Sequence, residues 1–442
     1  YFYNNPASPS SRFSNVIHSV YADRTGNIWM CTYNKGLEKI SFTTPQFKTG
    51  KVNKTLSTLT SNEVRAMAQL SNGDILMATK DGFIRFFDGN MNELGTLSQN
   101  GGLNSGPKLN DLAYCFHQDK KQNIWIGTKG GGILLLKPKS RTQFVMQRFV
   151  NNPLDNTSLS NDNVYSIIED NKGRILVGTF GGGLNVVSEV NGKISFLNYR
   201  NKLNNYPIQT CSKVRHLLQD RSNTLWVATA NGMLQIDNFL ASGMKEFYIE
   251  KLPDKNNSLS NNDVHYLCLD HQNQLWIGTF GGGLNKLISK ANAENPASFE
   301  NYSIKDGMSS DIVLSILEDK NGYLWFSSEN SISRFDSKSK FFQNYDLFDG
   351  KSDAHFSEAA GLYSRAGVMY FGGNKGYAYF SPVKIQPSQE KPSIEFTRFQ
   401  LFNNNVKVGE EGSPLENSIG YSDEIRLSHK QSVFSIEYVA LD

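Results

Sequence analysis

Short apolar segments alternate along the chain with clusters of Gly, Asn, Asp and Ser. Two such segments are VYSIIED (164–170) and VHYLCLD (264–270), in which β-branched and aromatic residues recur with a period of two. Turn sequences such as DNKGR and DKNGY follow segments of this kind. A period of two bounded by turn residues predicts short β-strands and disfavours a helical solenoid, whose period would be 3.6.

One apolar strand motif recurs about every 50 residues. Aligned on its central residue, the copies are NIWMCT, DILMAT, NIWIGT, RILVGT, TLWVAT, QLWIGT, YLWFSS and VMYFGG, with that residue at Trp29, Leu76, Trp125, Leu176, Trp226, Trp276, Trp325 and Tyr370. Each unit also holds a strand led by an apolar residue, most often Val, before the motif, and two further strands after it. Four short antiparallel strands per unit, repeated in series, predict an all-β fold of the β-propeller type.

The runs TFGGGLN at 179–185 and 279–285 allow two interpretations. A glycine-rich loop can cradle a phosphate, but it then leads into a helix N-terminus. Here a strand follows, and other units carry SENSIS or TANGML at the same place. We therefore predict that Gly281–Gly283 form the bend of a hairpin and that Trp276 belongs to the core.

The repeated unit resembles the two-component regulator propeller repeat. The resemblance rests on V-x-x-I-x-x-D-x-x-G-x-L-W-x-G-T-x-x-G-G-L-N and on the connectors at 151–164 and 252–264. Residues 355–385 resemble the last blade of such propellers. Residues 391–408 and 424–442 resemble the start of the Tyr-Tyr-Tyr domain, a β-sandwich.

The resemblance implies a division of the chain. Residues 45–385 would form a seven-bladed β-propeller, closed by a strand at 46–50. Residues 1–44 would be the last blade of an upstream propeller, and 391–442 the N-terminal part of a truncated Tyr-Tyr-Tyr domain. An eight-bladed ring closed by residues 1–5 is the alternative, and the repeats themselves leave both open.

The resemblance also implies a function. Propellers of this family are the extracytoplasmic sensor part of hybrid two-component regulators in Bacteroides-type bacteria, and their usual ligands are oligosaccharides from glycan degradation. We accordingly expect a periplasmic location, an oligosaccharide ligand and a homodimer in the full-length receptor. A downstream membrane span and a histidine kinase would lie outside this chain, which begins without Met and is interpreted as a fragment.

Composition narrows the function classes. The 442 residues include 38% hydrophobic and 20% charged residues, which is typical of a globular protein. The net charge of +3 and the scattered Lys and Arg give no electrostatic case for nucleic acid. The four cysteines form neither a Cys-x-x-Cys pair nor a metal-ligand spacing with His, so we expect neither a metal nor a cofactor.

Two other functions compete with the sensor. A carbohydrate-active propeller enzyme, sialidase- or lyase-like, needs catalytic carboxylates, whereas the aspartates here recur in the repeated turn, as structural residues do. A protein-binding scaffold is the second alternative, against which the appended sandwich argues. We therefore expect no catalytic residues in this fragment.

Candidate ligand residues are those that break the repeat. The position after the leading apolar residue varies through Arg65, Ala113, Tyr165, Arg215 and His265. Arg suits a carboxylate or sulfate and Tyr suits the apolar face of a sugar. Pairing with groups of the neighbouring blade is the other interpretation.

A second variable position follows the Gly-Thr step of the anchor strand. It includes Lys129, Phe180 and Phe280. The two phenylalanines are either exposed platforms for a sugar or packing between blades.

Overall fold

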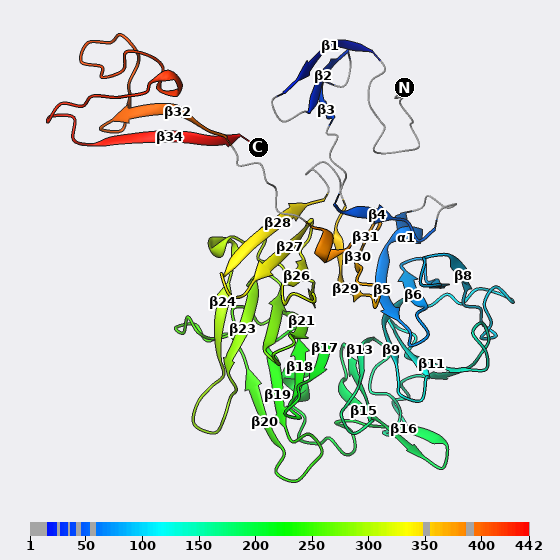
Figure 1. Ribbon diagram of the computed structural model, residues 1–442. Coiled ribbons are helices and arrows are strands. Elements are labelled where there is room, and N and C mark those ends of the chain that lie inside the picture. Colours follow the sequence, from blue (N-terminus) through cyan, green and yellow to red (C-terminus); the bar gives the residue numbers. More distant parts are fainter. Residues whose placement is uncertain are drawn as a thin grey trace. The chain divides into compact units, whose positions relative to one another are not determined.

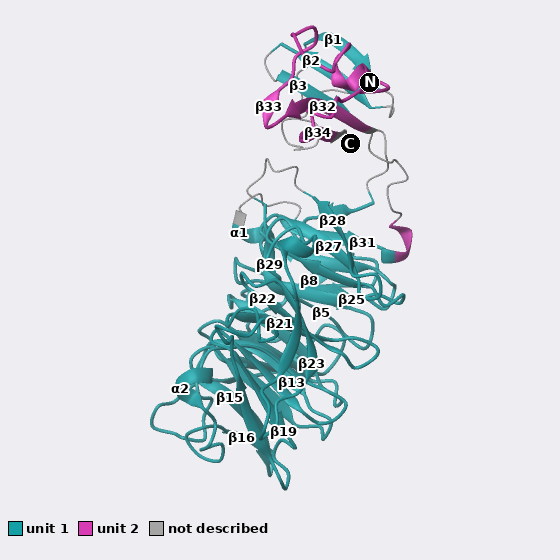
Figure 2. Cartoon of the chain, turned by 90° about the vertical axis from the view of Figure 1, so that its left-hand side faces the viewer, with its two compact units in different colours: residues 1–382 teal, residues 383–442 magenta. Residues whose placement is uncertain are grey.

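The computed structural model describes residues 16–23, 27–33, 36–40, 46–53, 59–347, 354–385 and 393–441. The chain divides into two compact units, residues 1–382 and 383–442 (Figure 2). In the described residues, no helix is both long enough and apolar enough to span a membrane.

The first unit contains seven four-stranded antiparallel sheets among its described residues (Figure 1). Their strands, in the order in which they pair, are β5 (Val64–Gln69), β6 (Ile75–Thr79), β7 (Ile84–Phe87) and β8 (Glu93–Thr96); β9 (Ala113–Gln118), β10 (Ile124–Thr128), β11 (Ile133–Pro138) and β12 (Phe144–Phe149); β13 (Val164–Glu169), β14 (Ile175–Thr179), β15 (Gly183–Val190) and β16 (Lys193–Leu197); β17 (Val214–Gln219), β18 (Leu225–Thr229), β19 (Met233–Asp237) and β20 (Lys245–Ile249); β21 (Val264–Leu269), β22 (Leu275–Thr279), β23 (Leu284–Ser289) and β24 (Ser298–Tyr302); β25 (Ser315–Glu318), β26 (Leu324–Ser327), β27 (Ser331–Asp336) and β28 (Phe341–Asp346); and β29 (Phe356–Tyr363), β30 (Met369–Gly373), β31 (Gly376–Phe380) and β4 (Lys48–Gly50).

The first strand of each sheet lies innermost and contacts the first strand of the next. This series runs β5, β9, β13, β17, β21, β25 and β29, and β29 contacts β5 again, so the sheets form a closed β-propeller. The strand predicted at 46–50 is present as β4, which pairs antiparallel with β31 and completes the last sheet. Residues 1–5, which would close the alternative eight-bladed ring, lie outside the described residues.

A separate three-stranded sheet precedes the ring in sequence. It consists of β1 (Ile17–Ala22), β2 (Ile28–Thr32) and β3 (Gly36–Ile40), and it repeats the first three strands of the other units. That it is the last blade of an upstream propeller stays a prediction.

The second unit holds a three-stranded sheet of β33 (Asn404–Asn405), β32 (Ser393–Leu401) and β34 (Phe434–Leu441). Phe399, Leu415 and Ile419 form its small core. Its assignment to a Tyr-Tyr-Tyr domain also stays a prediction. Helices are few and short in the described chain: α1 (Leu59–Asn62), α2 (Ile208–Cys211), and the 3-10 turns η2 (Ile304–Asp306), η3 (Pro382–Lys384) and η4 (Ile419–Tyr421).

The core lies between consecutive sheets. Trp276 of β22 is buried and belongs to the same cluster as Val313, Ile316 and Phe335 of the next sheet. Its indole lies edge-on to the Phe335 ring, with 5.7 Å between centroids. The prediction that Trp276 is a core residue is confirmed.

An aspartate in most of the repeated turns ties two strands together. In the turn between β25 and β26, Asp319 Oδ1 accepts the backbone N–H groups of Asn321 (2.8 Å) and Tyr323 (3.1 Å). Asp319 Oδ2 accepts the Trp325 indole N–H at 2.8 Å. Four other turns show the same Asp–Trp bond, at Asp23–Trp29, Asp119–Trp125, Asp220–Trp226 and Asp270–Trp276. The turn aspartates are thus structural in these units.

The glycine runs are hairpin bends, as predicted. Gly281 and Gly283 have φ of 91° and 75°, in the region that side chains disfavour. A β-carbon on Gly283 would overlap the carbonyl oxygen of Tyr302, and one on Gly282 would lie 2.5 Å from Ser260 Oγ. β23 follows directly, so this loop leads into a strand and not into the helix that a phosphate loop requires.

We predict that Asp319→Asn lowers the free energy of unfolding by about 2 kcal/mol, because an amide cannot accept both the backbone and indole N–H groups that the carboxylate accepts. Urea denaturation measures the loss. The control is Asp88→Asn: Asp88 accepts the N–H groups of Asn90 and Asn92 in a turn that lacks the Trp. Equal losses in the two variants would contradict a special role of the Asp–Trp bond.

The glycine bend gives a second prediction. Gly283→Ala should destabilise the protein by about 3 kcal/mol, from backbone strain plus overlap with the Tyr302 carbonyl. The control Gly192→Ala has a φ of 79° but open space around its α-carbon, so only backbone strain of about 1 kcal/mol is expected. Denaturation curves of the two variants that coincide would show that crowding at Gly283 is unimportant.

Candidate functional site

Each of five inner strands carries a β-bulge immediately after its first residue. In β13, Val164 pairs with Thr179 and Ser166 with Gly178, so Tyr165 is skipped in the ladder. A residue left out in this way is re-aimed away from the regular pleat. The skipped residues are Arg65, Tyr114, Tyr165, Arg215 and His265. Arg65, Tyr165, Arg215 and His265 are candidate residues from the sequence. The sequence prediction of Ala113 is wrong, because Ala113 pairs in register with Thr128 and Tyr114 is the skipped residue of this strand.

The skipped residues of neighbouring strands touch one another. The Arg65 guanidinium donates to Tyr114 Oη at 2.8 Å and lies over its ring. The Tyr114 and Tyr165 rings are 4.8 Å apart, and Tyr165 stacks on Phe180 at 5.0 Å. We call these residues, together with Arg215, His265 and Phe280, the inner-strand cluster. The sequence interpretation that such residues pair with the neighbouring blade therefore holds for Arg65.

Arg215 is likewise engaged within the protein. Its Nε donates to Asp263 Oδ1 and its NH1 group to Glu358 Oε1, both at 2.8 Å. Burial alone would raise the pKa of the Asp263 carboxyl, but the proximity of His265 and the hydrogen bonds and charge of Arg215 lower it overall. Arg215 is therefore neutralised by two carboxylates, and the interpretation of this residue as a free cation for an acidic sugar is not supported.

His265 is buried at the centre of the same group of charges. Its side chain is 5% exposed and lies 3.4 Å from both Asp263 and Glu358. Within the described residues neither ring nitrogen has a partner in hydrogen-bonding geometry. The imidazole stacks on Phe280, with 5.1 Å between centroids.

The residues after the Gly-Thr step lie beside this cluster. The backbones of Lys129, Phe180 and Phe280 bridge to the start of the next sheet, at Asn163, Lys213 and Ile312. Phe280 stacks on His265 with one face, yet 43% of its surface is exposed, so it packs within the protein and is also accessible to a ligand. Phe180 is half-buried and is covered by Tyr165, Lys213 and Arg215, which makes it chiefly a packing residue.

The unit between these two phenylalanines has Ala230 at the equivalent position. Its backbone N–H donates to the carbonyl of Lys213, the residue before β17. Ala230 thus presents only a methyl group where the two flanking units present the aromatic side chains of Phe180 and Phe280. Lys213 was missed from the sequence because it precedes the strand and matches no repeated residue type.

Two lysine ammonium groups of this region have no carboxylate partner among the described residues. Lys129 lies over the Tyr114 ring at 5.8 Å and Lys213 over the Phe180 ring at 5.6 Å. Both side chains are exposed, and in the described part of the chain neither makes an ion pair with a carboxylate.

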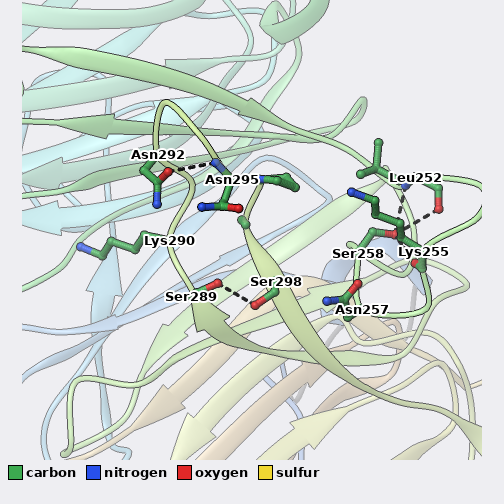
Figure 3. A pocket seen from close by; sticks show the side chains of 11 residues that line it. Leu252, Lys255, Asn257, Ser258, Ser289, Lys290, Asn292, Asn295 and Ser298 are labelled. Atoms are coloured by element: carbon green, nitrogen blue, oxygen red, sulfur yellow. Dashed lines mark hydrogen bonds between the residues drawn. The ribbon is translucent and has the colours of Figure 1, made fainter.

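A hollow elsewhere on the sheet β21–β24 is a weaker candidate. It has a volume of about 420 Å³ and is lined by the connector at 252–258 and the β23–β24 hairpin (Figure 3). Ser289 bonds to Ser298 there. Lys290 points away and donates to Asp220, Ser222 and Thr224. The hollow has no aromatic side chain in its lining, so it offers a sugar no stacking face, unlike the inner-strand cluster.

Comparison with known proteins identifies the type of repeat. A family model described as "Two component regulator propeller" matches residues 11–34, 158–181, 258–281 and 307–330. A histidine kinase from Formosa agariphila is 24% identical over 366 residues, which cover 72% of this chain and 26% of that protein. The chain therefore spans about a quarter of the curated relative.

Solved structures share the fold. The extracellular domain of a hybrid two-component system from B. thetaiotaomicron superposes with a TM-score of 0.63 at 22% identity, over 96% of this chain and 52% of that one. A virginiamycin B lyase from Staphylococcus aureus superposes with a TM-score of 0.52 at 15% identity, over 75% and 98%. The lyase shows that a propeller of this kind also supports enzymes, whereas the sequence matches lead to regulators. The chain carries two-component regulator propeller repeats.

Proposed function

We propose that this chain is the ligand-sensing extracytoplasmic region of a hybrid two-component histidine kinase and response regulator, and that it binds oligosaccharides from glycan degradation. The repeats and the similarity to a histidine kinase support the regulator. The observation that carries the ligand class is Phe280, an aromatic ring that stacks on a buried imidazole with one face and is 43% exposed. Sugars present apolar C–H faces that stack on such rings.

The inner-strand cluster supplies the polar groups that sugar binding requires. The Asp263 carboxylate is 31% exposed and borders the strand that carries His265. A carboxylate fixed by Arg215 is a preorganised acceptor for sugar hydroxyl groups, because its position is set before the ligand arrives. A sugar stacked on Phe280 would therefore meet a ring face and an ionic acceptor together.

Signalling then requires a difference between two states. A ligand shifts a receptor only by its differential affinity for the two arrangements. In the proposed receptor the propeller lies in the periplasm, pairs of receptors form a homodimer, and the C-terminal unit passes the bias toward a membrane span and kinase outside this chain.

A lyase- or sialidase-like enzyme is the alternative that the fold allows. The carboxylates beside His265, Asp263 and Glu358, share one arginine at 2.8 Å. The pKa of Asp263 is lowered overall by its partners despite burial, which keeps it ionised and unsuited to protonate a leaving group. We therefore favour binding without catalysis, and we rank a protein-binding scaffold below it because the appended C-terminal unit suits a signalling protein.

We predict that Phe280→Ala weakens oligosaccharide binding at least tenfold, because one stacking face is lost, while the melting temperature changes by only about 2 °C. Titration calorimetry against a panel of glycan oligosaccharides measures the affinity. Phe341→Ala is the control, since Phe341 is 63% exposed on the outermost strand β28. Absence of binding across the panel, together with tight binding to a protein, would refute the oligosaccharide sensor.

Arg215 gives a prediction about the cluster itself. Arg215→Met should lower the free energy of unfolding by about 2 kcal/mol at pH 7, since Asp263 and Glu358 lose their shared partner while partly buried. Unpaired carboxylates have raised folded-state pKa values, so the deficit should shrink as the pH falls from 7 to 5. Chemical denaturation at both pH values measures this. Lys121→Met, which breaks only the exposed Lys121–Glu189 pair, should cost under about 0.5 kcal/mol; a deficit independent of pH would argue against charge as the cause.

A further inference from the structure

We infer that the oligosaccharide is anionic, and that Lys129 and Lys213 bind its carboxylate or sulfate ester groups on either side of Phe180. This inference rests on the proposed function and specifies the ligand of the same site. In this inference the anion is bound by Lys129 and Lys213 and not by Arg215. Lys129 is a candidate from the sequence, whereas Lys213 is recognised only in the structure.

The first support is the position of the two ammonium groups. Lys213 lies over the Phe180 ring, and Lys129 lies over Tyr114, whose ring contacts Tyr165, which stacks on Phe180. The aromatic rings Tyr114, Tyr165 and Phe180 therefore form a continuous stack with an ammonium group at each end. Ala230 adjoins the Lys213 end through the Ala230–Lys213 backbone hydrogen bond.

The second support is the balance of charge among the nearby acids. The Glu63 carboxylate pairs with Lys80 and Arg65, and Asp111 pairs with Arg148 at 2.7 Å. Asp263 and Glu358 are taken by Arg215. The carboxylate of Asp162, whose backbone carbonyl accepts the N–H of Gly130, accepts the backbone N–H of Asn151 at 2.6 Å. Glu63, Asp111, Asp263 and Glu358 thus have cations of their own, and the two lysines leave local positive charge that a neutral sugar would not use.

The chemistry of lysine fits this role. An exposed ammonium is a mobile point charge with three donors, which suits carboxylate and sulfate groups at varied positions along a sugar chain. A charge-assisted hydrogen bond is roughly twice as strong as a neutral one. An anionic sugar bound along these aromatic rings would thus be selected over its neutral counterpart by both lysines.

The test compares charged and neutral probes on the same protein. Titration calorimetry uses oligogalacturonate, sulfated galacto-oligosaccharides and neutral galacto-oligosaccharides of equal length. Salt at about 150 mM screens non-specific attraction between charges. We expect at least one anionic probe to bind at least tenfold more tightly than the neutral one. Lys129→Gln and Lys213→Gln should each weaken that probe about tenfold without changing the melting temperature. Lys172→Gln, in the exposed turn between β13 and β14, is the matched control and should bind normally.

The outcomes separate this inference from the proposed function. Neutral oligosaccharides that bind as tightly as charged ones, with a loss in Phe280→Ala but none in the lysine variants, would overturn the anionic ligand and leave the sensor intact. Loss of binding in Lys172→Gln equal to that in Lys213→Gln would overturn it as well, because the attraction would then be non-specific. No binding of any probe would count against the proposed function itself.

Discussion

The hydrogen bond from a buried tryptophan indole to a turn aspartate is the interaction around which four of the seven ring sheets are built. In the sheet β25–β28, one carboxylate closes the turn between the inner and anchor strands and at the same time fixes the rotamer of the Trp325 indole. That indole packs on Phe380 of the following sheet, so a local turn also determines a contact between sheets. In the unit β13–β16, Leu176 replaces the tryptophan, and the Arg174 guanidinium donates to Asp170 at 2.6 Å instead. The turns before β6 and β30 have Leu70 and Ser364 in place of the aspartate.

Because turns and anchor strands carry the packing, the bulged start of each inner strand is free to vary. A bulge releases one side chain per sheet from the ladder without disturbing the pairs on either side. The released residues range from Arg65 through Tyr165 to His265, and together they line a region that belongs to several sheets at once. The charged and aromatic candidate residues therefore lie at the bulged positions, where the sequence departs from the repeat, as is common for sites on rigid scaffolds.

The sequence predicts most of the fold, since a regular period, the turn residues and the closing strand at 46–50 are local signals. It predicts the site only in part. Pattern alignment cannot see the bulge that makes Tyr114, and not Ala113, the equivalent of Tyr165. Nor can it foresee that Arg215 pairs with Glu358, which lies 143 residues away along the chain, because such a pair depends on ring closure. Phe280 shows the other limit, since its stacking on His265 and its exposure depend on how the strands pack in three dimensions.

Ring closure also brings groups together that consecutive sheets could not. Arg215 belongs to β17, while Glu358 belongs to β29, and β21 contacts β29 directly. His265 lies against both Asp263 and Glu358, so a ligand that displaces Phe280 would disturb a charge cluster shared by non-adjacent sheets. The sheet β29–β31 is the one from which the chain continues to residues 393–441. A cluster with two discrete arrangements at this place would give the proposed sensor a physical element that ligand binding can bias, which is what coupling between distant sites requires.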